Sequence, residues 1–181
     1  MKKIPLLGKN VEELKQVVLA YKLPAFTAKQ IADWLYKKQV RTIMDMTNLS
    51  MKAREILSAD YEVGVSDPAH ISVSSDGTEK YLFPVGDGSK FIEAVYIPEK
   101  DRATLCISSQ IGCQMNCLFC ATGKQGFSGN LTVAEIINQV QSINHTEKLT
   151  NVVFMGMGEP LNNKDVVLKA IDIMTSDYGY G

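Results

Sequence analysis

The chain has 181 residues, of which 45% are hydrophobic and 22% are charged, and its formal net charge is −1. This balance is typical of globular proteins and excludes disordered, collagen-like and low-complexity chains. No stretch approaches the roughly 18 uninterrupted apolar residues of a membrane helix, and charge follows the basic start too closely for a signal peptide. We therefore expect a cytoplasmic protein with no membrane partner.

The charge is distributed unevenly along the chain. Residues 1–60 contain 11 Lys and Arg against 6 Asp and Glu, a net of +5, whereas residues 61–181 contain 8 against 14, a net of −6. A basic segment of this kind can meet a polyanion, although a solvated basic helical surface has the same composition.

Residues 1–60 predict a small helical module. Asn10 can cap a helix that Pro24 ends, with apolar residues at the helical period: Val11, Leu14, Val17, Val18 and Tyr21. Thr27 can cap a second helix, on which we expect Trp34 to belong to the core. A third helix runs from about Ser50 through Leu57.

Residues 61–100 predict a β-meander. The short β-rich runs 71–74, 81–85 and 91–97 are separated by two turn signals, Ser75-Asp76-Gly77 and Gly86-Asp87-Gly88.

Residues 103–175 predict two βα units, as in an α/β barrel or a doubly wound sheet. The strands are 103–109 and 151–155, and the second is apolar enough for a buried parallel sheet. The helices are 132–143, which Thr132 and Glu135 can cap as a capping box, and 165–175. Two parallel strands cannot close a barrel, so we expect the chain to be incomplete as a folding unit.

All four cysteines lie within fifteen residues, and the last three form a C-x3-C-x2-C run: Cys106, Cys113, Cys117 and Cys120. Clustered thiols in a reducing compartment indicate metal ligands or reactive groups. Zinc would need a fourth ligand, which Cys106 could supply. An iron–sulfur cluster held by three cysteines would leave one iron open to a substrate.

A second motif follows the second strand. Gly156-Met157-Gly158-Glu159-Pro160 places glycines where backbone can approach a ligand, and a carboxylate that could accept hydrogen bonds from an ammonium group. Without further context, such a run is usually only a turn.

Together these motifs resemble the radical S-adenosylmethionine (SAM) superfamily. The resemblance implies that Cys113, Cys117 and Cys120 hold a 4Fe–4S cluster, and that Gly158 and Glu159 bind the amino group of SAM. Reductive cleavage of SAM then yields a 5′-deoxyadenosyl radical, with a one-electron donor such as flavodoxin.

The stretch from Glu93 to Leu131, EAVYIPEKDRATLCISSQIGCQMNCLFCATGKQGFSGNL, closely resembles the RlmN/Cfr family of radical SAM RNA adenine methyltransferases. This implies a helical accessory domain (1–60), an antiparallel β-linker (61–100) and the first two βα units of an incomplete (β/α) barrel (101–181). It also implies methylation of adenine C2 in 23S rRNA and in tRNA, or of C8 in rRNA. A cysteine-cluster module that binds RNA without catalysis is the alternative from another class.

The same resemblance assigns two catalytic residues. Cys106 takes the place of a thiol that attacks a methyl-carrying cysteine near the C-terminus and resolves a protein–RNA adduct, and Glu93 takes the place of the base that removes the adenine proton. No cysteine follows Cys120 in this sequence, so we expect this chain alone to be inactive. Basic residues of the first module are the candidate RNA contacts: Lys29, Lys37, Lys38 and Arg41.

Overall fold

The computed structural model describes residues 3–180, which form two compact units. The helical unit consists of residues 3–65 and 169–180, and the sheet unit consists of residues 66–168. The three-part division at residues 60 and 100 stays a prediction. No helix among the described residues is long and apolar enough to cross a membrane.

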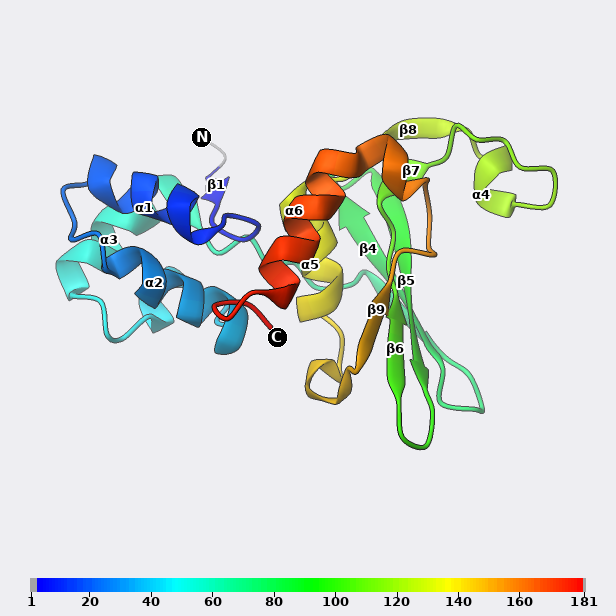
Figure 1. Cartoon of the computed structure of the whole chain (residues 1–181), viewed down its shortest axis with the longest axis horizontal. Helices are drawn as coiled ribbons and strands as arrows, with labels where there is room; N and C mark the ends of the chain where they lie inside the picture. Colours follow the sequence, from blue (N-terminus) through cyan, green and yellow to red (C-terminus); the bar gives the residue numbers. More distant parts are fainter. Residues whose placement is uncertain (1–2, 181) are drawn as a thin grey trace. The chain divides into compact units, whose positions relative to one another are not determined.

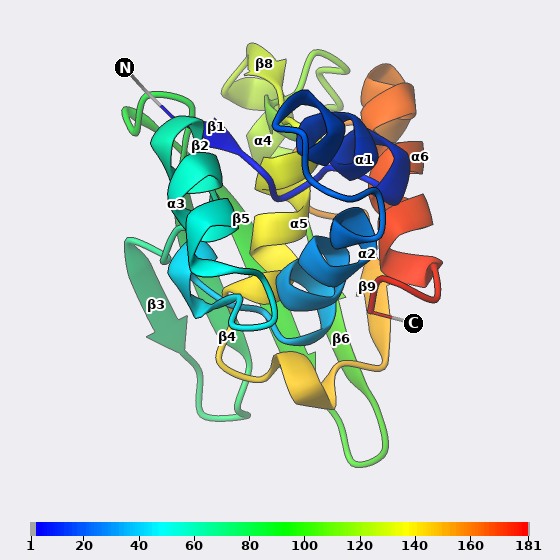
Figure 2. The same ribbon diagram turned by 90° about the vertical axis from the view of Figure 1, so that its left-hand side faces the viewer.

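Residues 3–65 of the helical unit contain three α-helices and a short parallel pair of strands (Figures 1 and 2). The strands are β1 (Ile4–Pro5) and β2 (Tyr61–Glu62), and the helical elements are α1 (Val11–Ala20), α2 (Thr27–Ala32), the π-helix η1 (Asp33–Lys37), the 3-10 helix η2 (Ile43–Asp45) and α3 (Met51–Asp60). From residue 169 onward, α6 (Lys164–Thr175) belongs to this unit, where Lys169 Nζ lies 2.6 Å from Glu13 Oε1.

One of the two predicted caps in this unit, Asn10, is confirmed, and the third helix begins after Ser50 as expected. Asn10 Oδ1 accepts the Glu13 N–H at 2.9 Å and the Glu13 carboxylate accepts the Asn10 N–H, while Ser50 caps α3. The Thr27 cap is wrong, because Thr27 is the first residue of α2 and its predecessor has no side-chain cap. Helix α1 also ends earlier than predicted, since Lys22 already adopts a left-handed φ of 56°.

Trp34 is partly exposed, so its expected place in the core is wrong. Its indole N–H donates to Asn48 Oδ1, and the Lys38 ammonium lies 3.8 Å from the ring centroid. Lys38 also forms an ion pair with Asp33 at 3.0 Å. The aromatic side chain buried in this region is instead that of Tyr36.

The sheet unit is built on a five-stranded sheet in the order β3-β4-β5-β6-β9 (Figure 1). Its strands are β3 (His70–Val73), β4 (Glu79–Val85), β5 (Lys90–Pro98), β6 (Ala103–Cys106) and β9 (Asn151–Val153). The predicted meander is confirmed, and β6 and β9 pair in parallel, as expected for two βα units. The meander and the first parallel strand therefore share one sheet.

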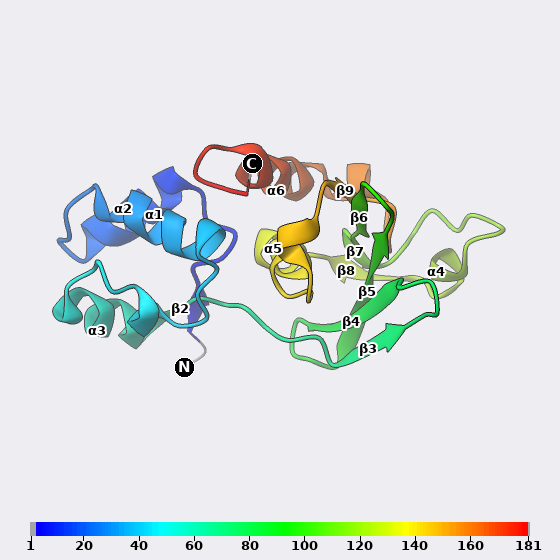
Figure 3. The ribbon, with the colours of Figure 1, turned by 90° about the horizontal axis from the view of Figure 1, so that it is seen from below.

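Helix α5 (Val133–Gln141) covers one face of this sheet, whereas the loop that carries the cysteines extends on the other side (Figure 3). The predicted Thr132–Glu135 capping box begins the helix. Alternate strand residues are buried on the covered face, among them Tyr81, Phe83, Ile92, Ala94 and Leu105. Residues between them point to the opposite face.

The two parallel strands are shorter than predicted. Strand β6 ends at Cys106. The Ile107 N–H still donates to the Val153 carbonyl of β9 at 2.9 Å, but the N–H and C=O of Ser108 pair with the side chain of Gln139 instead of a strand. Strand β9 is partly exposed rather than buried, since it is an edge strand of the described sheet.

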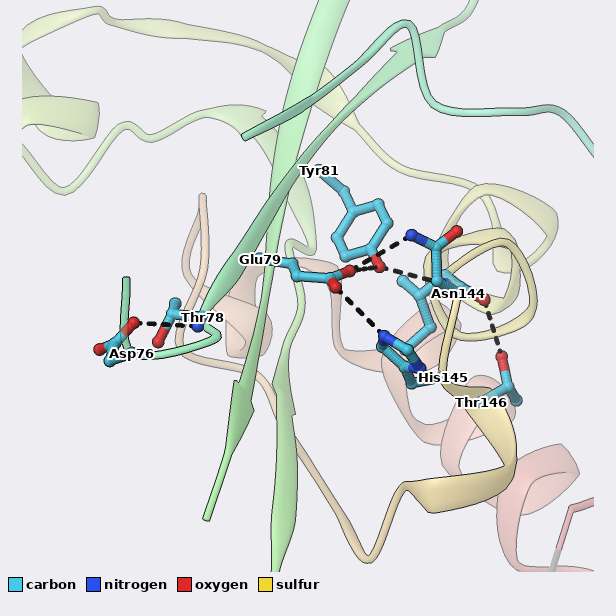
Figure 4. Close-up of polar contacts among 8 residues, drawn as sticks. Asp76, Thr78, Glu79, Tyr81, Asn144, His145 and Thr146 are labelled. Atoms are coloured by element: carbon cyan, nitrogen blue, oxygen red, sulfur yellow. Dashed lines mark hydrogen bonds and ion pairs between the residues drawn. The ribbon is translucent and has the colours of Figure 1, made fainter. Parts of the chain in front are cut away.

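A buried polar cluster joins the start of β4 to the segment after α5 (Figure 4). Glu79 is a buried residue, and its carboxylate accepts a hydrogen bond from the Tyr81 hydroxyl and lies 3.1 Å from His145 Nε2. The Asn144 N–H donates to the Tyr81 hydroxyl at 3.1 Å. Each partner satisfies a polar group that would be costly to bury alone, so this cluster fixes α5 on the sheet.

Candidate cofactor site

The three clustered cysteines lie on the loop between β7 (Gln110–Gly112) and α4 (Ala121–Lys124), at the end of the sheet where β6 finishes (Figure 1). β7 pairs with β8 (Phe127–Asn130), and this narrow ribbon forms the base of the loop. Gly112 has a φ of 72°, and a Cβ there would lie 1.8 Å from the Gly126 carbonyl oxygen. Only glycine therefore permits this close approach, directly before Cys113.

The cysteines differ in their surroundings. Cys113 is buried, Cys117 is exposed and Cys120 is intermediate. A hydrogen bond from the Gly123 N–H to the Cys120 thiol lowers the pKa of that thiol, which favours the thiolate that a metal requires. The Cys120 N–H donates to the Cys117 carbonyl at 3.0 Å and thereby closes the turn between them.

The cysteine loop supplies three thiols that could bind a metal, but in this conformation the three thiols do not lie close together. Within residues 3–180, no three His, Cys, Asp or Glu side chains are close enough to hold a metal ion. Leu118 and Phe119, on the same loop, are 92% and 93% exposed. Three thiols within eight residues are a soft donor set that suits iron–sulfur chemistry, so the loop fits a cluster once it closes around one.

The Gly-Glu-Pro loop, residues 156–160, is fastened to the segment after β6. Gly156 N–H donates to the Ile107 carbonyl at 3.0 Å, and the Met157 carbonyl accepts from Ser109 and Gln110 N–H at 2.9 and 3.2 Å. Gly158 has a φ of 97°, and a Cβ there would lie 2.5 Å from Gln110 Cβ. The close approach that requires glycine at this position is therefore to Gln110 of the same chain, and the predicted approach to a ligand stays a prediction.

Glu159 lies where an ammonium group could reach it. One carboxylate oxygen accepts the Leu161 N–H at 3.1 Å, so Glu159 caps the start of η4 (Pro160–Asn163). A carboxylate has further acceptor sites for a charged ligand. The amide of Asn162 in η4 lies 3.6 Å from the Met115 sulfur, so the helix that follows Glu159 touches the cysteine loop.

Glu93 and Cys106 share the sheet face that α5 leaves uncovered. Cys106 pairs directly with Val95, and Glu93 lies two residues before Val95 on β5 and thus on the same face. Glu93 Oε1 lies 3.1 Å from Lys80 Nζ. Burial raises the pKa of the Cys106 thiol, although a hydrogen bond from the Met155 backbone opposes this shift.

Four buried polar residues of this site were missed at the level of sequence. They are Ser108, Gln110, Gln139 and Asn163. Gln110 Oε1 accepts the Glu159 N–H at 2.9 Å, and Asn163 donates to the Ser109 and Leu131 carbonyls, both at 2.9 Å. The only signal for Ser108 and Gln110 in the sequence is polarity next to an apolar strand, as in Ser108-Ser109-Gln110.

Two families match separate parts of the chain. Residues 4–63 match the family described as the ribosomal RNA large subunit methyltransferase N-terminal domain. Residues 107–179 match the radical SAM superfamily, whose members use a 4Fe–4S cluster and SAM.

The curated relatives match almost the whole chain. One from Bacteroides thetaiotaomicron, named probable dual-specificity RNA methyltransferase RlmN, is 59% identical over 99% of this chain and 52% of the relative. One from Geotalea uraniireducens, named dual-specificity RNA methyltransferase RlmN, is 44% identical over 99% of this chain and 52% of the relative. The chain thus spans about half the length of the curated relatives it matches.

A solved structure agrees with this relationship. The crystal structure of a radical SAM methyltransferase from Sphaerobacter thermophilus matches with a TM-score of 0.89 and 33% identity, over 98% of this chain and 53% of that chain. This confirms the expected α/β fold class, with part of a radical SAM fold. From its N-terminal family match, its cysteine motif and its relatives, the chain belongs to the RlmN family of the radical SAM superfamily.

Proposed function

We propose that this chain is the cofactor-binding part of a radical SAM methyltransferase that methylates C2 of an adenine in 23S rRNA and in tRNA. The observation that carries the proposal is the contact between the loop with three cysteines and η4, the short helix that Glu159 caps, beside the sheet face of Glu93 and Cys106. The relatives' names, dual-specificity RNA methyltransferase, support an RNA substrate. We expect the protein to act in the cytoplasm, with a flavodoxin-like electron donor.

In this proposal each loop has one task. Cys113, Cys117 and Cys120 would hold the 4Fe–4S cluster, and Gly158 and Glu159 would receive the amino group of SAM. When bound, the cluster and SAM supply the 5′-deoxyadenosyl radical. Glu159 is suited to its role because its backbone is held by Gln110, so its carboxylate starts from a defined position.

The open sheet face would handle the proton and the thiol chemistry. Glu93 would accept the proton from the adenine carbon, and Lys80, 3.1 Å away, keeps a positive charge beside that carboxylate. The Cys106 thiolate would attack the sulfur of the family's methyl-carrying cysteine while a methylene group joins that sulfur to the adenine. The S–S bond would form as the S–CH2 bond breaks, and the electron pair of that bond would pass to the adenine, which takes up a proton to complete the methyl group. Cys120 is the last cysteine of this sequence, so the 181-residue chain alone should not turn over.

A hybrid protein tests the proposal. This chain would replace the matching part of the Bacteroides thetaiotaomicron relative, and RNA methylated by the hybrid would be digested and analysed by mass spectrometry. We expect 2-methyladenosine, whereas 8-methyladenosine would favour the C8 alternative.

Metal content separates the proposal from a module that only binds RNA. Anaerobic reconstitution of the 181-residue chain should give about four irons per chain. Stoichiometric zinc, together with no methylation by the hybrid, would contradict the radical SAM function.

A further inference from the structure

One buried hydroxyl connects the residues that the proposed function assigns to different steps. Ser108 lies two residues after Cys106 and is fully buried. Its hydroxyl donates to the Glu93 carbonyl at 2.6 Å and accepts the Met157 N–H at 2.9 Å. Ser108 therefore joins β5, the end of β6 and the Gly-Glu-Pro loop.

The backbone of Ser108 is itself held by a side chain of helix α5. Gln139 of α5 is fully buried, and its Oε1 accepts the Ser108 N–H at 2.8 Å while its Nε2 donates to the Ser108 carbonyl at 3.0 Å. The amide thus takes the place of a neighbouring strand and satisfies both backbone groups where the sheet ladder ends. Helix α5 thus holds the backbone from which the Ser108 hydroxyl extends.

The Gly-Glu-Pro loop is shaped to lie against this hydroxyl. A Cβ on Gly156 would lie 2.8 Å from Ser108 Oγ and 2.7 Å from the Ile107 carbonyl oxygen. Any side chain at Gly156 would therefore push the loop away from Ser108. This steric fit is independent of the hydrogen bonds.

We propose that Ser108 is a positioning residue that fixes the Gly-Glu-Pro loop against the Glu93 strand, with Gln139 as its support. The proposal rests on the proposed function for the roles of Glu93 and Glu159. A proton acceptor and an ammonium-binding carboxylate serve the same reaction only if their spacing is constant, and a displacement of about 1 Å can lower a rate by about 10²-fold. The hydroxyl sets that spacing because it bonds to both segments.

Amide hydrogen exchange in the 181-residue chain tests the positioning itself. In Ser108→Ala and in Gln139→Met, the Met157 N–H should exchange about tenfold faster, since it loses its acceptor or the support of that acceptor. The Glu159 N–H bonds to Gln110 rather than to Ser108, so it should accelerate only if the whole loop loosens. We expect it to accelerate severalfold in both variants.

Two further variants serve as controls. Ser109→Ala removes an equally buried neighbouring hydroxyl that has no hydrogen-bond partner among residues 3–180, and should leave both rates unchanged. Ser108→Thr keeps the hydroxyl and should return the rates toward those of the parent chain. Acceleration at Met157 alone, or equal effects of Ser109→Ala and Ser108→Ala, would overturn the positioning role.

A SAM titration tests whether the position of the Gly-Glu-Pro loop affects cofactor binding. In the iron-reconstituted chain, SAM binding is followed by the change that it causes in the electron paramagnetic resonance spectrum. Ser108→Ala should need about tenfold more SAM for half of this change, while its iron content stays the same. Ser108→Thr should restore the SAM requirement of the parent chain. A parent chain that loads iron but does not respond to SAM would contradict the SAM site at Glu159, whereas the exchange rates would still decide the role of Ser108. An unchanged SAM requirement in Ser108→Ala would overturn the inference.

Discussion

Substitution of Gly158 by alanine tests how tightly the Gly-Glu-Pro loop is built. The residue has a φ of 97°, and its Cβ would lie 2.5 Å from Gln110 Cβ, 2.7 Å from Gln110 Cγ and 2.8 Å from Gln110 N. The last of these is a backbone atom, so rotation of the Gln110 side chain cannot relieve the contact. Either the loop or the start of β7 must move.

The contacts of Gly158 and Gln110 allow the loss of stability in Gly158→Ala to be worked out. A left-handed alanine costs about 1–2 kcal/mol. Displacement of Gln110 would also break its bonds to the Glu159 N–H, at 2.9 Å, and to Asn130, at 2.7 Å. Each such bond contributes about 1 kcal/mol net, so Gly158→Ala should destabilise the sheet unit by about 3–4 kcal/mol.

Gly88→Ala is the matched control. Gly88 has a φ of 85°, and a Cβ there would meet nothing within 4 Å. This variant has the same backbone strain without the clash, so the difference between the two variants isolates the clash and the lost bonds at about 2 kcal/mol.

Hydrogen exchange of the buried strand amides, such as those of Ala94 and Leu105, measures this difference. Under conditions where exchange reports the opening equilibrium, Gly158→Ala should exchange about 30-fold faster than Gly88→Ala. Rates within about twofold of each other would refute the reasoning, because Gln110 would then move aside at no cost.

The remaining predictions concern the cysteines. Replacement of Cys113, Cys117 or Cys120 by alanine should each abolish iron binding in the reconstituted chain, whereas Cys106→Ala should keep it; equal loss in all four would indicate a four-cysteine site. Because burial raises the pKa of Cys106, alkylation of this thiol in a variant without the other three cysteines should begin at higher pH when folded than in urea. A folded midpoint at or below the unfolded one would contradict that sign. In the hybrid, Cys106→Ala should accumulate a nuclease-sensitive protein–RNA adduct on a denaturing gel, and normal turnover without an adduct would argue against the resolving role.

Much of the local structure could be predicted from the sequence. The capping boxes of Asn10 and Thr132 each join residues three positions apart, so neighbouring residues are enough to define them. Strand alternation also identifies which of Glu93 and Ala94 faces away from α5. The errors at Thr27 and Trp34 arose because several residues nearby could serve as a cap or fill the core.

The candidate site was predicted only in part, because its geometry depends on loop conformation and on contacts between residues far apart in the sequence. The spacing of Cys113, Cys117 and Cys120 identifies a donor set, whereas the gathering of the three sulfurs depends on the conformation of a loop whose apolar side chains are exposed. The Gly158-Glu159 motif identifies a possible ammonium site. The buried Gln110 that holds it is separated from Glu159 by 49 positions.

The sequence by itself determined the residue types of the candidate ligands, the caps at Asn10 and Thr132 and the alternation of the strands, because each depends on residue type and on neighbours within a few positions. Only the tertiary structure decided that Ser108 would join Glu93 and Met157, which are 15 and 49 positions away, and be held by Gln139, 31 positions away. A hydrogen bond between such distant residues forms only after the sheet and α5 have packed. Until then each of these groups bonds to water, and the sequence does not distinguish them from other polar residues.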